Sequence, residues 1–241
     1  MTTDPEVSIP GIQFYIDYNG IGSNTKRIKI DIEETWKIES KYPIRWIWDG
    51  RVLETFTPPD YSKKVCWKTS SCNNIYVLST ERMTDNKYLK YPLHNIMNTS
   101  VKLFNGYSLL ISQSSISEST YRYFEKIHAN IITEGGLYNT QPQLIEGNFI
   151  NLSDQNKRVL GNFYVSSVSS KRIFFTHIPD FDLNIKPICE PAILDYGFYF
   201  IRGIDKPIYL WFDGGTFRLS DACVDCTSLG GTTIKPDFWP N

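Results

Sequence analysis

The sequence lacks any long apolar run. None of its uninterrupted apolar stretches approaches the roughly 18 residues that a membrane-spanning helix needs, so no transmembrane segment is expected. The opening residues, MTTDPEVSIPG, also lack the basic and apolar segments of a signal peptide. Two interpretations stay open: a cytosolic protein, or an exported protein whose export signal is not in this chain.

An excess of charge is also missing. The 25 basic and 26 acidic side chains nearly cancel, which gives no electrostatic footprint for nucleic acid. No serine lies in a Gly-x-Ser-x-Gly motif, and the turns GIGSN and DGGT lack the lysine of a phosphate-binding loop. The sequence therefore predicts no catalytic residue, no cofactor and no metal ligand.

Cysteine is sparse, and its spacing suggests three kinds of site. Cys223 and Cys226 form a Cys-x-x-Cys pair that is typical of zinc sites, redox dithiols or disulfide frameworks. Zinc is disfavoured because no second pair exists, and a reactive thiolate is disfavoured because Asp221 and Asp225 place negative charge beside the pair. A structural disulfide is the remaining interpretation, and it requires an oxidising compartment.

Aromatic residues and period-two patterns are abundant. In RIKIDIEETWKIE the apolar residues fall on even positions and the charged residues on odd ones, which predicts a long antiparallel strand with one buried face. Glu34 is the one exception on that apolar face. Further short segments of this kind, separated by turn residues, predict a mainly β fold of antiparallel sandwich or barrel-like sheets.

One amphipathic helix is expected at about residues 115–133, with Ser115 and Glu118 as a capping box. We expect a single mainly-β domain over residues 1–241. Loops are predicted at 56–64, because of Pro58 and Pro59, and at 82–105. The best candidate for a long connection is 180–191. Later strands are expected at 144–152, 158–168 and 195–203.

Two tryptophans offer the one candidate contact surface. Trp46 and Trp48, in WIWDG, fall on one face of a predicted strand, where two rings can bind a sugar or peptide ligand or a partner. Burial in the core is the favoured alternative, since large aromatic side chains are mostly buried.

Several segments, taken in order, resemble a known family. They are IQFYIDYNG, IDIEETWKIES, KVCWKTS, YSLLISQSSISESTYRYFEKI, QPQLIEGNF, VLGNFYVSSVSSKRIFF and CVDCTSLGGTTIKPDFW. Together they resemble the Bacteroidota family called domain of unknown function 4249, whose members look like outer-membrane lipoproteins encoded beside SusC-type TonB-dependent receptors. Members usually carry a signal peptide, a lipid-bearing cysteine and an N-terminal sandwich domain, so this chain looks like the C-terminal portion of such a protein, without those three parts.

The resemblance implies a non-enzymatic role at the cell envelope, in ligand capture or as partner of a TonB-dependent receptor. Two alternatives remain: a hydrolase acting on a glycan or peptide, and a structural component of an envelope assembly. The resemblance also implies that four cysteines belong to the family pattern and Cys72 does not. The four are Cys66, Cys189, Cys223 and Cys226. Four cysteines in an exported protein suggest two disulfides, in any of three connectivities.

Overall fold

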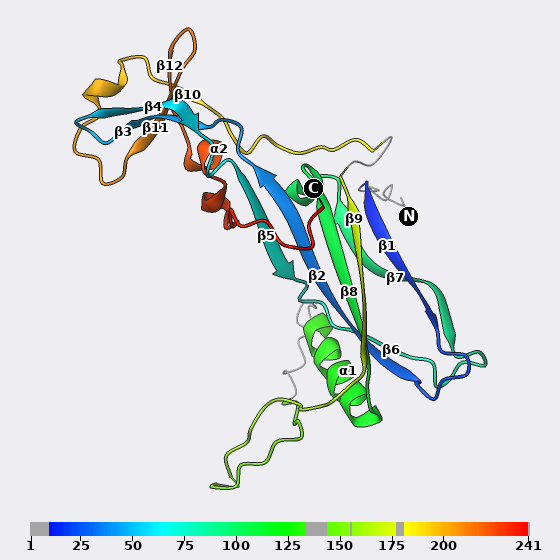
Figure 1. Ribbon diagram of the computed structural model, residues 1–241. Helices are drawn as coiled ribbons and strands as arrows, with labels where there is room; N and C mark the ends of the chain where they lie inside the picture. Colours follow the sequence, from blue (N-terminus) through cyan, green and yellow to red (C-terminus); the bar gives the residue numbers. More distant parts are fainter. Residues whose placement is uncertain (1–9, 134–143, 155, 177–180, 241) are drawn as a thin grey trace, which may run out of the picture.

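The fold is mainly β, as predicted, and is built from three open antiparallel sheets. The computed structural model describes residues 10–133, 144–154, 156–176 and 181–240. Figure 1 shows the central sheet in the middle of the molecule, a strand pair on one side of it and a second sheet beyond one end of strand β2. None of the described sheets closes on itself.

The central sheet has the order β5-β2-β8-β9, with β6 also paired to β2. Its bounds are Arg27–Glu39 for β2, Val65–Ser71 for β5, Tyr76–Ser79 for β6, Tyr107–Ser115 for β8 and Val168–Phe175 for β9. Strand β2 is the long strand that the alternating pattern predicts, and its even positions are buried. The period-two pattern thus sets which face of this sheet meets the core.

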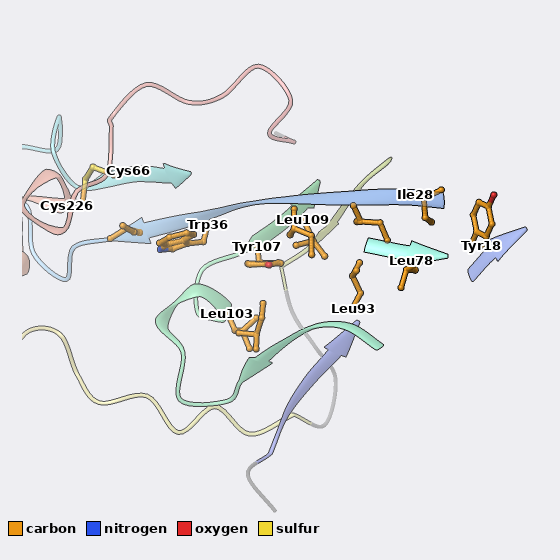
Figure 2. Close-up of a cluster of buried hydrophobic side chains, with 14 residues drawn as sticks. Tyr18, Ile28, Trp36, Cys66, Leu78, Leu93, Leu103, Tyr107, Leu109 and Cys226 are labelled. Carbon is orange, nitrogen blue, oxygen red and sulfur yellow. A yellow bond between two sulfur atoms is a disulfide. The ribbon is translucent and has the colours of Figure 1, made fainter. Parts of the chain in front are cut away.

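A strand pair covers the apolar face of the central sheet. It consists of β1 (Gly11–Asn19) and β7 (Lys87–Met97). The core between the two layers is the cluster in Figure 2, which runs from Tyr18 to the Cys66–Cys226 disulfide. Leu109 and Tyr107 are fully buried there. Burying a leucine side chain contributes about 1.5–3 kcal/mol, so this cluster is the main source of stability in this half of the molecule.

The second sheet has the order β10-β12-β11-β3-β4. Its bounds are Ile44–Trp48 for β3, Leu53–Asp60 for β4, Ala192–Ile193 for β10, Ile208–Phe212 for β11 and Thr216–Leu219 for β12. Both of its faces carry apolar side chains, one around Trp48 and Leu210 and the other around Leu219 and Cys223. The 181–191 connection links it to the central sheet, in agreement with the predicted connection at 180–191 as far as it is described.

The predicted helix is α1, at Glu118–Thr133. It lies against β2 and β6 (Figure 1). The capping box predicted at Ser115 is wrong, since Ser115 ends β8 and the Ser117 hydroxyl instead accepts a hydrogen bond from the Thr120 N–H at 3.3 Å. Among the described residues no helix is long and apolar enough to cross a membrane. The other helical turns are short, namely η1 (Val101–Leu103), η2 (Phe198–Phe200), α2 (Asp221–Val224) and η3 (Cys226–Leu229).

Two segments predicted as loops are strands. The 82–105 segment contains β7, whose period is broken by two register shifts against β1. The 56–64 segment overlaps β4, although Pro58 and Pro59 have no backbone N–H to donate to a neighbouring strand. They are tolerated because β4 is an edge strand with a register shift between its pairings to Ile44 and Trp46.

Two predicted strands are absent from the described structure, and a third is confined to its last residue. Residues 195–203 contain the η2 turn. Residues 144–152 and 158–167 form the two legs of an arm that projects from the body below α1 (Figure 1). The legs have no ladder; the Asn148 amide bonds both the carbonyl and the N–H of Phe163, at 2.6 and 2.7 Å. The alternating pattern in these two segments therefore does not lead to strand pairing in the described structure.

Candidate functional site

The Cys-x-x-Cys segment bonds to two different parts of the fold. Cys226 in η3 is bonded to Cys66 on β5, and Cys223 in α2 is bonded to Cys189 on the 181–191 connection. The four cysteines that the resemblance implies therefore form two disulfides, and Cys72 is the free cysteine of the described chain. Within the described residues no three His, Cys, Asp or Glu side chains gather in a way that could hold a metal ion.

The C-terminal residues continue this attachment across the central sheet. Thr232 pairs with Trp67 of β5 through two backbone hydrogen bonds of 2.8 and 2.9 Å. The ring of Trp239 then packs against Trp67 and Phe174, and the Arg172 guanidinium lies 3.6 Å from the ring centre of Phe238. The segment after Cys226 is thus held by both strand-like pairing and aromatic packing.

A groove lies beside the Cys189–Cys223 disulfide, between the central sheet and the 181–191 connection. Its volume is about 600 Å³, within the range of about 300–1,000 Å³ that is usual for small-molecule sites. The groove is bounded by the end of β2, by β5, by the η1 turn, by the 181–191 connection and by α2. Its apolar lining consists of Trp36, Ile38, Val101, Phe104, Ile185, Pro187, Ile188, Ala222 and Leu229, beside Cys189.

Part of that apolar lining faces solvent. Phe104 is 61% exposed, Ile188 45% and Val101 40%. Trp36 lies deeper and is 7% exposed. Large apolar side chains gathered and exposed around one concavity are characteristic of a binding site.

Lysines surround the groove. The five that line it are Lys37, Lys41, Lys64, Lys68 and Lys186. Glu39 is the one carboxylate among the lining residues of the described groove, and it pairs with both Lys37 and Lys64 at 3.4 Å. Five positive charges against one negative charge leave a positive balance of four, so the groove favours an anion.

Ser40 is one of the residues lining the groove, and its hydroxyl is buried. The residue is 2% exposed, and its Oγ has no hydrogen-bond partner within the described structure. Its backbone N–H donates to the Lys64 carbonyl at 2.8 Å, which places it between Lys64 and its chain neighbour Lys41. A buried polar group without a partner costs free energy, so an acceptor brought to this position would be stabilised there.

A buried ionic network lies beneath the groove and is centred on Glu34. Its carboxylate is bonded by Lys102 Nζ at 2.5 Å, Tyr107 Oη at 2.9 Å and His94 Nε2 at 3.1 Å. Lys102 Nζ also lies 5.0 Å from the ring centre of Trp36, and Lys68 Nζ lies 5.9 Å from it. The indole that forms part of the groove wall is therefore held between the network and the lysine rim.

The network stabilises the ionised form of Glu34. Burial raises the pKa of this carboxyl, but the hydrogen bonds from His94, Lys102 and Tyr107 and the charge of Lys102 outweigh burial and lower the pKa to about 2. Burial, followed by the negative charge of Glu34, raises the pKa of Tyr107 well above its usual range. The network is fully paired and faces the core, so it has a structural role.

The two candidate tryptophans lie away from the groove, in the second sheet. Trp48 is buried, and its indole N–H donates to the Ile201 carbonyl at 2.6 Å, so it is a core residue. Trp46 is half-buried and packs edge-on against Trp211 and Phe212 at 5.7 and 4.9 Å. The Arg45 guanidinium covers its ring at 4.5 Å. The prediction of a ligand or partner contact at Trp46 stays a prediction.

Sequence reasoning did not find the groove. Its lining comes from five separated segments that only the fold brings together. One signal nearby was visible, because Glu34 interrupts an otherwise apolar strand face beside Trp36.

Comparison with known proteins gives a family and no established activity. No curated protein and no solved structure matches the chain. One family matches residues 2–172, which include most of the central sheet, the strand pair and three sides of the groove. The chain belongs to the family described as Domain of unknown function (DUF4249).

Proposed function

We propose that this protein is a non-enzymatic binding protein of the cell envelope, which captures a small ligand in the groove between the central sheet and the 181–191 connection. The observation that carries the proposal is the groove itself, with exposed apolar walls and a rim of lysines. A concave, mostly apolar site with a few polar groups is the usual form of a small-molecule site.

The cysteine pairing supports a location outside the cytosol. Two disulfides hold the C-terminal segment to strand β5 and to the 181–191 connection, and such bonds form and persist in oxidising compartments. Within the proposal that compartment is the outer membrane, the periplasm or the cell surface, as the resemblance implies.

Binding fits the groove better than hydrolysis does. A glycan hydrolase needs two carboxyl groups at a defined separation. Of the residues lining the described groove, Glu39 alone carries a carboxyl group, and two lysines already pair with it. The hydrolase alternative gains no support from this arrangement.

The proposal includes a TonB-dependent receptor as the partner that takes up the captured ligand. The projecting arm supports a protein partner, because it carries large apolar side chains far from the core. Leu152 is 91% exposed, Val165 85% and Ile150 78%. Exposed apolar surface of this kind is characteristic of protein interfaces.

Native mass spectrometry of the full-length protein from its own envelope tests ligand capture. We expect the wild type and Leu89→Trp, at an exposed β7 position, to carry a small molecule that Ala222→Trp lacks, because the new indole fills the groove. Phe104→Ser removes an exposed wall instead and should weaken binding without affecting the fold. Protein that carries nothing, or Ala222→Trp and Phe104→Ser that retain the molecule, would overturn the proposal.

Cross-linking in intact cells tests the partner. Residues of the arm should cross-link to an outer-membrane receptor. Recovery of the protein in the cytosolic fraction, without cross-links to any envelope protein, would contradict both the location and the partner.

A further inference from the structure

We infer that the groove binds a single-chain amphiphile with an anionic head group, a carboxylate or a phosphate monoester. The head would lie at Ser40, Lys41 and Lys64, and the apolar chain along Ile38 and Trp36 toward Phe104. The inference rests on the proposed function, and it names the chemical class and the orientation of the ligand.

The polarity of the groove follows from the period of strand β2. Trp36 and Ile38 are two residues apart and share the buried face of the strand, and Ser40 continues this spacing one residue beyond its end. At about 3.3 Å per residue, Trp36 and Ser40 are separated by ~13 Å. Along this wall the groove thus changes from an indole ring at Trp36 to a hydroxyl between two lysines at Ser40.

Two of the three donors at the head-group position lack an acceptor in the described structure. The Ser40 hydroxyl has no partner in the described structure, and the Lys41 ammonium contacts the Tyr42 ring, 5.3 Å from its centre, and no described carboxylate. Lys64 shares Glu39 with Lys37. A carboxylate or phosphate accepts several hydrogen bonds and supplies the missing negative charge, which a neutral head group does not.

The chain end excludes a fully polar ligand. Trp36, Ile38, Val101 and Phe104 offer aromatic and aliphatic surface, and the nearby Lys102 Nζ and Lys68 Nζ are already engaged, with Glu34 and the Leu229 carbonyl. A small anion alone would leave the exposed part of this surface, at Val101 and Phe104, in water. An attached apolar chain would cover it, and burial of its methylenes contributes binding free energy in proportion to chain length.

Matched probes distinguish the contribution of the anionic head group to binding from that of the apolar chain. Isothermal titration calorimetry of the full-length protein would compare decanoate and decyl phosphate with decan-1-ol, which has the same chain without charge, and with acetate and inorganic phosphate, which have the charge without the chain. We expect decanoate or decyl phosphate to bind at least about tenfold more tightly than decan-1-ol, and acetate and phosphate not to bind measurably. The preference between the two anions identifies the type of head group.

Variants locate the head. Lys41→Gln/Lys64→Gln and Ser40→Ala should each reduce the preference for decanoate over decan-1-ol, while Lys126→Gln on an exposed face of α1 should leave it unchanged. Raising the salt concentration should reduce the preference of the wild type, because salt screens exposed charges.

The outcomes separate the two proposals. Equal binding of decanoate and decan-1-ol, or a preference that survives Lys41→Gln/Lys64→Gln, would overturn the anionic head while leaving ligand capture intact. If neither decanoate nor decyl phosphate binds, the inference is overturned. Native mass spectrometry of the envelope protein then tests the proposed function separately.

Discussion

The Tyr107 hydroxyl donates a 2.9 Å hydrogen bond to the Glu34 carboxylate in the interior of the molecule. The two residues lie on neighbouring strands, β8 and β2, and the same carboxylate also contacts His94 from β7 and Lys102 from η1. One buried charge therefore connects both layers of the core to the wall of the groove. Its energetics are open to direct measurement.

The first prediction concerns acid stability. The pKa of Glu34 in the folded protein is about 2, below its ordinary value near 4.5, so its ionisation stabilises the fold above the unfolded pKa. This contribution is lost as the pH falls from about 4.5 to about 2, and it amounts to on the order of 3 kcal/mol. Urea unfolding across this pH range should show a smaller loss of unfolding free energy for Glu34→Gln than for the wild type.

A matched control is Glu81→Gln, which removes a carboxylate from a surface ion pair with Arg27. Its side chain is 55% exposed, and such pairs contribute about 0–1 kcal/mol. Its acid profile should therefore follow the wild type. If Glu34→Gln followed the wild type too, the network would not stabilise the ionised carboxyl.

The second prediction is that removing one charge of the network is worse than removing both. Lys102→Met leaves the buried Glu34 carboxylate without its cation and should destabilise the protein by about 3–5 kcal/mol. Glu34→Gln/Lys102→Met leaves no net charge behind and should be the more stable of the two variants. Chemical denaturation at pH 7 measures both, with Lys126→Met as the surface control. A double variant less stable than Lys102→Met would contradict the prediction.

The third prediction concerns the cysteines. In protein from an oxidising compartment, a thiol assay under denaturing conditions should find one free thiol, that of Cys72, and five after reduction. Cys66→Ser/Cys226→Ser should cost up to about 5 kcal/mol and Cys189→Ser/Cys223→Ser up to about 4, because the first bond closes the longer loop. Cys72→Ser should leave both bonds and the stability nearly unchanged. Five free thiols before reduction, or equal stability of all three variants, would exclude the pairing.

The fourth prediction concerns the arm. A Cβ added at Gly147 would lie 1.4 Å from the Gly161 carbonyl oxygen on the facing leg, so Gly147→Ala must separate the legs. Trypsin should then cut more rapidly after Lys157 or Arg158 on the arm, while the unfolding free energy stays within about 0.5 kcal/mol of the wild type. Gly215→Ala, whose added Cβ would lie 3.7 Å from its nearest neighbour, Phe217, is the control. Unchanged cleavage of Gly147→Ala would show that the legs are not in contact.

Strands and helices are predictable from the sequence where one periodic pattern of apolar residues continues along the whole element. Strand β2 pairs without a register shift to β8, so its alternation is unbroken and its position is predicted to the residue. Strand β7 escapes prediction because register shifts move its side chains from one face to the other. The arm shows the reverse case, since its alternating pattern has no sheet partner.

The groove could not be predicted in the same way. Trp36 and Ile188 are far apart in the chain, and their proximity depends on the disulfides and on the path of the 181–191 connection. Sequence spacing favours a structural role for Cys223 and Cys226 but cannot assign their partners. Only the fold shows that one of these two neighbours is bonded to strand β5 of the central sheet and the other to the 181–191 connection.

That divided attachment has a consequence for biogenesis. Cys223 and Cys226 follow strands β1 to β12 in the chain, so neither crosslink can form until every strand has left the ribosome or the export channel. All strands of the described structure are therefore available for noncovalent pairing before either native disulfide can form. A thiol oxidase acting on the emerging chain would find Cys66 and Cys189 without their native partners, beside the unpaired Cys72, so native crosslinking can only follow synthesis of Cys223 and Cys226.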